Sequence, residues 1–364
     1  MQKNENLKYY SAFSHLSVRP YFKSKLFEYF DFDIERAFKA DKVQIQKMSE
    51  ELDINIPQDY FTKKTKINPE ECYKNDFAKK EVNILTYEDE KYPKLLKEIP
   101  DFPLSLYYLG NIEDIDFTYP IAMVGSRRAT SQAISALNNI ISGLRNSNIV
   151  IISGLAYGID AAAHIGALEN NIKTIGVIAS GLDVIYPYQN KKIYQDIIKE
   201  KGLIFSEYPL GVEPFKYNFP QRNRIVVGLS KGTLVAEAQI KSGAMISANL
   251  TLDYNRELMC IPGNVLNPNT SGIYKLIKEG ASIVTNTEDL LNALNWDIKP
   301  DKIENRLLNP IEQKIINMLS FEDKSFDEIA LEIKEEFSSI MIALTELELK
   351  GLIKQANGKY DIVK

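Results

Sequence analysis

The sequence predicts an α/β fold with an extended, mostly parallel sheet, preceded by a small helical domain and followed by a winged-helix domain. In the middle of the chain, short apolar strands alternate with helical patterns, which implies right-handed crossovers and a buried parallel sheet. The chain before this stretch has only short helical patterns, and the chain after it combines helical patterns with a hairpin. We therefore expect domains at residues 1–75, 80–295 and 310–364.

Composition narrows the class of protein. The chain has 364 residues, of which 45% are hydrophobic, so two or three domains with sizeable cores are expected. No apolar run approaches the roughly 18 residues of a membrane span, and the net charge of −5 means that nucleic acid would need a local basic patch. Cys72 and Cys260 lie far apart in the sequence and suit a reducing cytoplasm better than a disulfide framework. Because the chain has only two cysteines and two histidines, we expect no metal site, and we expect no cofactor.

The N-terminal region is rich in tyrosine, phenylalanine and lysine. Helical patterns cover residues 21–30 and 34–38, and a polar stretch containing prolines places a domain boundary near residues 62–80. The aromatic residues recur at helical spacing, so we interpret them as core rather than as a platform for stacking bases. They are Phe22, Phe27, Tyr29, Phe30, Phe32 and Phe38.

The turn at residues 125–128 is the first candidate site. An apolar strand at 121–124 ends at Gly125, and a helical stripe begins at Ala133, so the turn lies beside a helix N-terminus. Free backbone N–H groups and the positive end of the helix dipole favour an anion there. Gly125 lets a phosphate approach closely, and Arg127 and Arg128 can bind its oxygens. The alternative is a surface turn with solvated arginines.

Further strands repeat this unit along the chain. Residues 84–86 and 104–109 form an extended lead-in, and strands are expected at 149–153, 173–179, 203–206, 233–236, 257–261 and 282–285. Glycine-containing turns follow several of these strands, and sheets of this kind bind ligands at the carboxyl ends of their strands. No turn has the G-x-G-x-x-G pattern, so a dinucleotide site is not predicted.

The stretch at residues 215–224 is the second candidate site. It contains three aromatic residues and three cations directly before an apolar helix. Single-stranded nucleic acid needs this mixture, because each base offers a stacking face and each nucleotide a phosphate. Pro220 fits a first helical turn, so Arg222 and Arg224 oppose the helix dipole, which suggests that they serve a ligand. The alternative is a helix-capping loop with buried aromatic rings.

The C-terminal residues follow a linker expected at 296–310. Three helical patterns and strands at 352–355 and 360–363 have the order of a winged helix-turn-helix. Residues 310–364 contain seven lysines, no arginine and eleven acidic residues, whereas a DNA reader presents cations to phosphate. We therefore expect a protein-contact or regulatory module. The expected recognition helix at 338–350 has more apolar positions than one face must bury: Ile340, Ile342, Leu344, Leu347 and Leu349.

The core contains a series of linked motifs. They are Gly125–Arg127, Ser153–Ala156, Gly158–Asp160, His164, Gly181–Asp183, Tyr186-Pro187, Ser206–Pro209, Phe219–Arg224, Gly228–Ser230, Glu237-Ala238, Ser242-Gly243, Pro262-Gly263 and Glu279–Ala281. Together they resemble the DNA-processing protein A family, DprA or Smf, over about residues 82–290. The architecture is similar to that of its longer members, with a small SAM-like helical domain, a Rossmann-like core and a winged-helix tail. Tyr157 and Ser247 depart from the arginine and threonine frequent in the family.

The resemblance implies binding rather than catalysis. Proteins of this family bind incoming single-stranded DNA, protect it, displace single-strand-binding protein and load the RecA recombinase in natural transformation. They form homodimers through the later part of the core, here around residues 273–277. The resemblance implies that Arg127 and Lys216 hold phosphates, that a base stacks on Phe219, and that other residues complete the site. The implied DNA-binding residues are Gly125, Ser126, Arg127, Lys216, Phe219, Arg222 and Arg224.

The competing hypothesis is a nucleoside-monophosphate phosphoribohydrolase of the same superfamily. Such enzymes carry a P-G-G-x-G-T-x-x-E motif that places a glutamate beside the ribose. Here Ser230–Thr233 with Glu237 lacks the double glycine and spaces the glutamate differently. Release of the base from adenosine monophosphate, dependent on Glu237, would favour the hydrolase.

Overall fold

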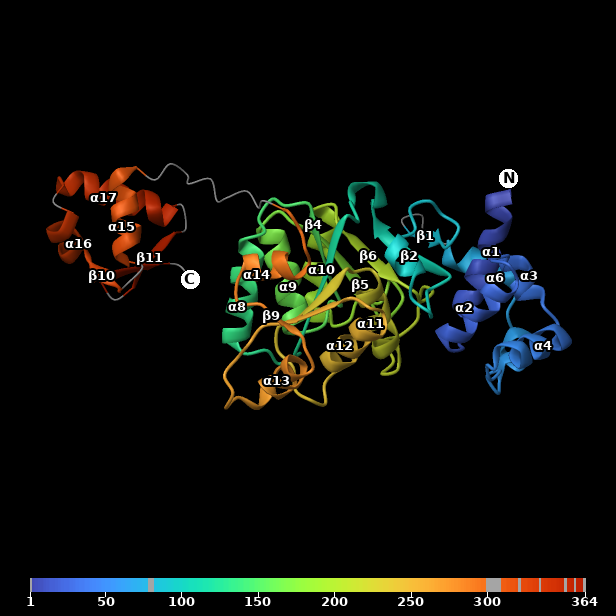
Figure 1. Cartoon of the computed structure of the whole chain (residues 1–364). Coiled ribbons are helices and arrows are strands. Elements are labelled where there is room, and N and C mark those ends of the chain that lie inside the picture. The colour runs from blue at the N-terminus through green and yellow to red at the C-terminus, as the bar shows by residue number, and fades with distance from the viewer. Residues whose placement is uncertain are drawn as a thin grey trace. The chain divides into compact units, whose positions relative to one another are not determined.

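The computed structural model describes residues 2–77, 82–298, 309–319, 322–333, 335–349, 352–356 and 358–362 (Figure 1). The chain divides into two compact units, residues 1–300 and 301–364. Most of the linker expected at 296–310 lies outside the described residues, but Trp296 is buried and its ring lies 5.3 Å from that of Tyr119. The packed core therefore extends past residue 295. No described helix is long and apolar enough to cross a membrane.

Short helices form the N-terminal region. Four of the six aromatic residues expected in its core are buried, whereas Phe32 is 43% exposed and stacks on Tyr87. One hydrophobic cluster runs from these helices into the sheet, and the buried Asp76 accepts hydrogen bonds from Ser11 and Tyr107. The boundary near residues 62–80 thus does not separate two independent cores. The helices are α1 (Gln2–His15), α2 (Pro20–Tyr29), α3 (Ile34–Lys39), α4 (Lys42–Leu52), α5 (Tyr60–Lys64) and α6 (Pro69–Asp76).

In the described part of the chain, nine strands form one sheet in the order β1-β2-β6-β5-β4-β3-β7-β8-β9. The strands from β6 to β9 pair in parallel, and β1 and β2 add an antiparallel edge. The predicted mostly parallel sheet is confirmed, and the extended lead-in supplies that edge. The strands are β1 (Asn83–Thr86), β2 (Ser105–Gly110), β3 (Tyr119–Val124), β4 (Ile149–Ser153), β5 (Lys173–Ile178), β6 (Leu203–Ser206), β7 (Gly232–Val235), β8 (Glu257–Cys260) and β9 (Ser282–Ile283).

Helices cover both faces of this sheet because its strands are apolar on both sides. Ile121 and Met123 of β3 pack in one hydrophobic cluster with α8 and α9, whereas Ala122 and Val124 pack in another with α11 and α12. The helices of the core are α7 (Lys94–Lys97), α8 (Ser131–Ser142), α9 (Ile159–Glu169), α10 (Lys191–Lys199), α11 (Asn218–Gly228), α12 (Gly243–Asp253), α13 (Ser271–Lys278) and α14 (Thr287–Ala293), with short 3-10 turns at Ile112–Asp114, Tyr188–Asn190 and Pro268–Thr270.

The strand order reverses at β3. The chain passes from β3 through β4 and β5 to β6 on one side, and then returns to β7 on the other side of β3. Such a reversal leaves a crevice outside the carboxyl ends of the strands, where ligands of open α/β sheets bind. The turn at residues 125–128 follows β3 directly, so it lies at this crevice.

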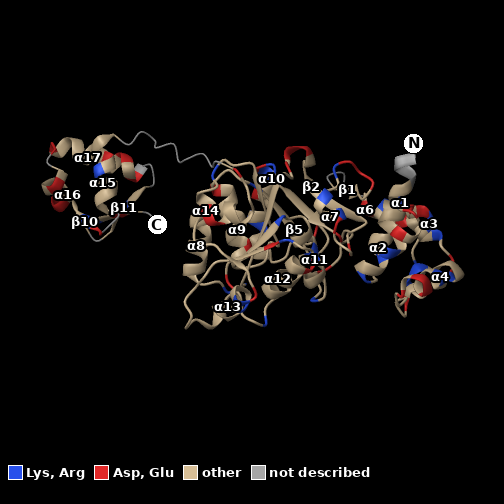
Figure 2. Cartoon of the chain, viewed as in Figure 1, with Lys and Arg blue, Asp and Glu red and all other residues tan. Residues whose placement is uncertain are grey.

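The second unit has the predicted winged-helix order. Ile340, Leu344 and Leu347 are buried in its core, Ile342 is 59% exposed, and the side chain of Leu349 lies outside the description. Acidic residues, red in Figure 2, lie on α16. The elements are α15 (Pro310–Leu319), β10 (Lys324–Ser325), α16 (Phe326–Ile333), α17 (Phe337–Leu349), β11 (Ile353–Ala356) and β12 (Lys359–Ile362).

Candidate nucleic-acid interface

A cleft of about 960 Å³ opens at the carboxyl ends of the parallel strands. Residues from the end of β3, the start of α9, the loop before α11 and the start of α12 line it. The structure thereby brings together the two candidate stretches, which lie far apart in the sequence. Six of the seven predicted site residues line the cleft: Gly125, Ser126, Arg127, Lys216, Phe219 and Arg222.

The turn after β3 is held from two sides. Ser126 donates its backbone N–H to the carbonyl of Glu237 at 2.7 Å, and its own carbonyl accepts from the N–H of Ile159 at 3.2 Å. Gly158 has φ +73°, and a Cβ at that position would collide with the Ser126 carbonyl. Because the N–H of Ser126 is engaged, it is not free for a phosphate. The side chains of Arg127 and Arg128 are exposed and line the cleft, so they are the cationic groups of this turn that an anion can reach.

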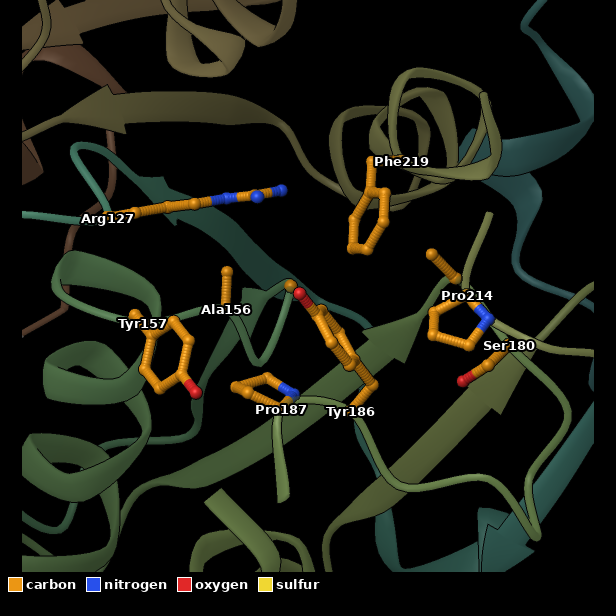
Figure 3. Close-up of a pocket in the computed structure, with 10 residues that line it drawn as sticks. Arg127, Ala156, Tyr157, Ser180, Tyr186, Pro187, Pro214 and Phe219 are labelled. Atoms are coloured by element: carbon orange, nitrogen blue, oxygen red, sulfur yellow. The ribbon is translucent and has the colours of Figure 1, made fainter. Parts of the chain in front are cut away.

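The side chains of Arg127 and Phe219 point toward each other (Figure 3), and both residues line the cleft. The Arg127 Cζ atom lies 4.8 Å from the centroid of the Phe219 ring, a cation–π distance. The Tyr186 ring contacts the same phenyl group edge-on, with 5.7 Å between centroids. Phe219 is half-buried and belongs to none of the hydrophobic clusters found in the described residues. Its ring is therefore held by a cation and a second ring rather than by the core.

Arg222 lines the cleft but is only 3% exposed. Its guanidinium donates to the carbonyl of Val177, and a Cβ on Gly154 would collide with it. Burial raises the pKa of Asp160, an effect that the charge of Arg222 opposes. Burial likewise lowers the pKa of Arg222, and Asp160 opposes that shift. Arg222 thus compensates the negative charge of the buried Asp160 carboxylate, and its hydrogen bond to Val177 holds α11 against the end of β5.

The structure does not bring Arg224 to the cleft. This side chain is 2% exposed, and its Nη2 donates to both carboxylate oxygens of Glu207 at 2.5 Å. Asp101 lies 3.8 Å from its Nε. Burial lowers the pKa of Arg224, but the charges of Glu207 and Asp101 outweigh burial and raise it. Residues two apart on a helix point about 200° apart, so Arg222 and Arg224 face different surroundings.

Two protein-family models match the sequence of this chain. The family model described as DNA recombination-mediator protein A matches residues 83–295. The chain belongs to this family. The model described as DprA winged helix domain matches residues 300–359, which confirms the nature of the C-terminal unit.

Relatives in the DNA recombination-mediator protein A family cover most of the chain. It is 45% identical over 203 residues to DNA processing protein DprA of Streptococcus pneumoniae, covering 56% of this chain and 71% of that protein. It is 36% identical to Protein Smf of Synechocystis, and the match covers 80% of this chain and 73% of that protein. The X-ray structure of the Streptococcus pneumoniae protein matches with a TM-score of 0.67 and 34% identity, covering 79% and 97%. A Helicobacter pylori DNA processing protein A, described with a unique single-stranded DNA binding mode, matches with a TM-score of 0.53 and 33% identity, covering 58% and 96%.

Sequence reasoning missed part of the cleft of this family member. Tyr186 and the start of α12 appeared only as motifs, without a role, and Gln239 and Asn269 did not appear at all. Gln239 Nε2 donates to Asn269 Oδ1 at 2.6 Å, which joins two loops at the edge of the cleft. No local pattern marks these two residues, because their approach depends on the packing of β7 and α13.

Glu237 bears on the hydrolase hypothesis. Its carboxylate accepts hydrogen bonds from the backbone N–H of Thr130 at 3.1 Å and from Thr130 Oγ1 at 2.9 Å. Thr130 caps the N-terminus of α8, and Glu237 is 1% exposed and is not among the described residues that line the cleft. Glu237 therefore fixes the start of α8, whereas the hydrolase needs this carboxylate beside a ribose.

Proposed function

We propose that this chain binds single-stranded DNA in the cleft at the carboxyl ends of its strands. The observation that carries the proposal is the cation–π pair of Arg127 and Phe219, with Lys216 lining the same cleft. In this proposal a base stacks on the half-buried Phe219 ring, while Arg127 and Lys216 hold neighbouring phosphates. Gly125 and Ser126 line the cleft, and Gly125 lets the turn pack against α9, since a Cβ at this position would collide with the Ile159 side chain.

The two buried arginines have supporting roles in this proposal. Arg222 adds positive charge at the inner wall of the cleft, partly compensated by Asp160. Arg224 acts through Glu207, by holding α11 and the residues after β6 together. The single-stranded DNA binding described for the Helicobacter pylori relative supports single-stranded DNA as the ligand.

The biological role that we propose is DNA processing in natural transformation. The chain protects incoming single strands, displaces single-strand-binding protein and loads the RecA recombinase, without catalysing a reaction on the DNA. Support comes from the relatives named DNA processing protein DprA and from the engagement of Glu237 with Thr130. Free, buried Cys72 and Cys260 support the cytoplasm as its compartment. RecA filament formation on DNA coated with single-strand-binding protein, with and without this chain, tests the loading step.

We also propose a homodimer. Ile273 and Leu276 are fully buried within the chain, so their side chains are not available to a partner. Val265 and Leu266, in the preceding loop, are 71% and 85% exposed and offer an apolar surface instead. Sedimentation of the wild type and of Leu266→Asp tests this surface, because a charge there would dissociate the dimer.

The decisive experiment for DNA binding is a titration of the full chain with single- and double-stranded oligonucleotides of one sequence. We expect tighter binding of the single strand, and a loss of about tenfold or more for Arg127→Glu whatever the base sequence. Arg36→Glu is the matched control, because Arg36 is an exposed arginine that does not line the cleft. Equal affinity for both forms of DNA, or equal effects of the two substitutions, would overturn the proposal.

A further inference from the structure

A second groove, of about 480 Å³, lies where the N-terminal helices meet the loop before α11. The N-terminal region contributes the cations Arg19, Lys23 and Lys63 to its lining. The groove is distinct from the cleft that contains Phe219, because the two share no lining residue.

Residues 213–218 form the wall between the groove and the cleft. Side chains along this segment alternate: Lys216 lines the cleft, whereas Phe215 and Tyr217 line the groove. Asn218 anchors the segment, since it is 1% exposed and its Nδ2 donates to the carbonyl of Ala179 at 2.9 Å. The wall is thus fixed to the end of β5 and presents a cation to one side and rings to the other.

Phe215 and Tyr217 are stacked on each other and open to solvent. Their ring centroids lie 5.6 Å apart with an interplanar angle of 2°, and the residues are 50% and 58% exposed. Neither belongs to a hydrophobic cluster of the described residues. Two parallel rings outside the core form a stacking platform of the kind that binds successive bases.

The charge of the groove is positive. Lys63 pairs with Asp59 at 2.7 Å, and Glu207 pairs with Arg224, so these charges are compensated. The guanidinium of Arg19 is exposed and has no side-chain partner among the described residues. Lys23 donates to the carbonyl of Phe13 at 2.6 Å, which leaves its other ammonium protons for a ligand.

We propose that this groove is a second subsite for single-stranded DNA, and that one strand occupies both sites. The strand leaves the Phe219 cleft, passes Lys216 and continues with bases on Phe215 and Tyr217 and phosphates toward Arg19 and Lys23. The shared wall makes the path continuous, and rings combined with unpaired cations match the chemistry of a polynucleotide. This inference rests on the proposed function of the cleft.

Oligonucleotide length separates the two sites. Oligothymidylates of about 4 and about 16 nucleotides are titrated into the full chain, the shorter one filling only the cleft. We expect Phe215→Ala/Tyr217→Ala and Arg19→Glu each to weaken binding of the longer strand about tenfold while leaving the shorter one unchanged. Tyr21→Ala is the matched control, because Tyr21 is 45% exposed in the same region and does not line the groove.

The outcomes are distinct. Unchanged affinity for the longer strand in both variants would overturn the second subsite, and so would equal loss with both lengths, since the rings would then belong to the cleft. Failure of the wild type to bind either length would overturn the proposed function itself. Phe215→Trp provides a direct signal, because the one native tryptophan, Trp296, is buried. Its fluorescence should be quenched by the longer strand, and no quenching at saturation would refute stacking at this position.

Discussion

Replacement of Phe219 by alanine separates a stacking role from a packing role. The Phe219 ring is half-buried, lies outside the hydrophobic clusters and contacts Arg127 and Tyr186. Loss of one stacked base costs about 1–3 kcal/mol, which weakens single-stranded DNA binding by about 5- to 150-fold. Because little core is removed, we expect the melting temperature to stay within about 2 °C of the wild type.

A core role predicts a different pair of results. Truncation of a fully buried phenylalanine costs about 3–5 kcal/mol, which for a unit of this size lowers the melting temperature by roughly 6 °C or more. Fluorescence anisotropy with a labelled oligonucleotide and thermal unfolding of the same samples measure both quantities. Full affinity at an unchanged melting temperature would refute stacking on Phe219, and lost affinity with a large fall in melting temperature would show packing instead.

Two further variants sharpen this test. Phe219→Tyr keeps an aromatic face and should bind within about threefold of the wild type, a difference below roughly 0.7 kcal/mol. Arg127→Glu/Phe219→Ala should lose less than the sum of the single losses, because the ring and the guanidinium are in contact at 4.8 Å. Strictly additive losses would mean that Arg127 and Phe219 act on separate parts of the DNA.

Other predictions test the remaining features. Lys216→Ala should weaken single-stranded DNA binding. The slope of log affinity against log salt concentration should become shallower by about 0.7, the value for one phosphate contact, and an unchanged slope would show that Lys216 does not contact a phosphate. Deletion after residue 309, which removes the acidic winged-helix unit, should leave DNA affinity within about threefold, and a hundredfold loss in a folded dimer would show that this unit binds DNA. Burial, with the charge of Arg222, lowers the pKa of His164 from 6.5 to about 3. The unfolded chain therefore binds an extra proton between about pH 6.5 and 3, so the unfolding free energy should fall by up to about 1.4 kcal/mol per pH unit as acidity rises in that window. Urea unfolding at pH 7 and 5 should show a smaller fall for His164→Asn, and equal falls would contradict this account.

Local periodicity was enough to place most elements of the core. Apolar runs with branched side chains predict strands wherever they are bounded by glycine or polar residues, and the strands at 149–153 and 203–206 have the expected bounds. The mostly parallel sheet follows from the alternation of these elements, because a crossover through a helix returns the chain in the same direction. The meeting of residues 125–128 with residues 215–224 follows in turn, since both lie at carboxyl ends of strands in one sheet.

Contacts between distant elements were decided only by the tertiary structure. Arg222 and Arg224 are equivalent in sequence, two cations in one helical turn, yet one lines the cleft and the other is buried against Glu207. Glu237 likewise has no local pattern that reveals its bond to Thr130. Local pattern determines which face of an element is apolar. The partner of a buried cation, in contrast, is the carboxylate that the packed chain brings within hydrogen-bonding distance. Such a partner is needed because an unpaired charge in the interior is too costly to persist.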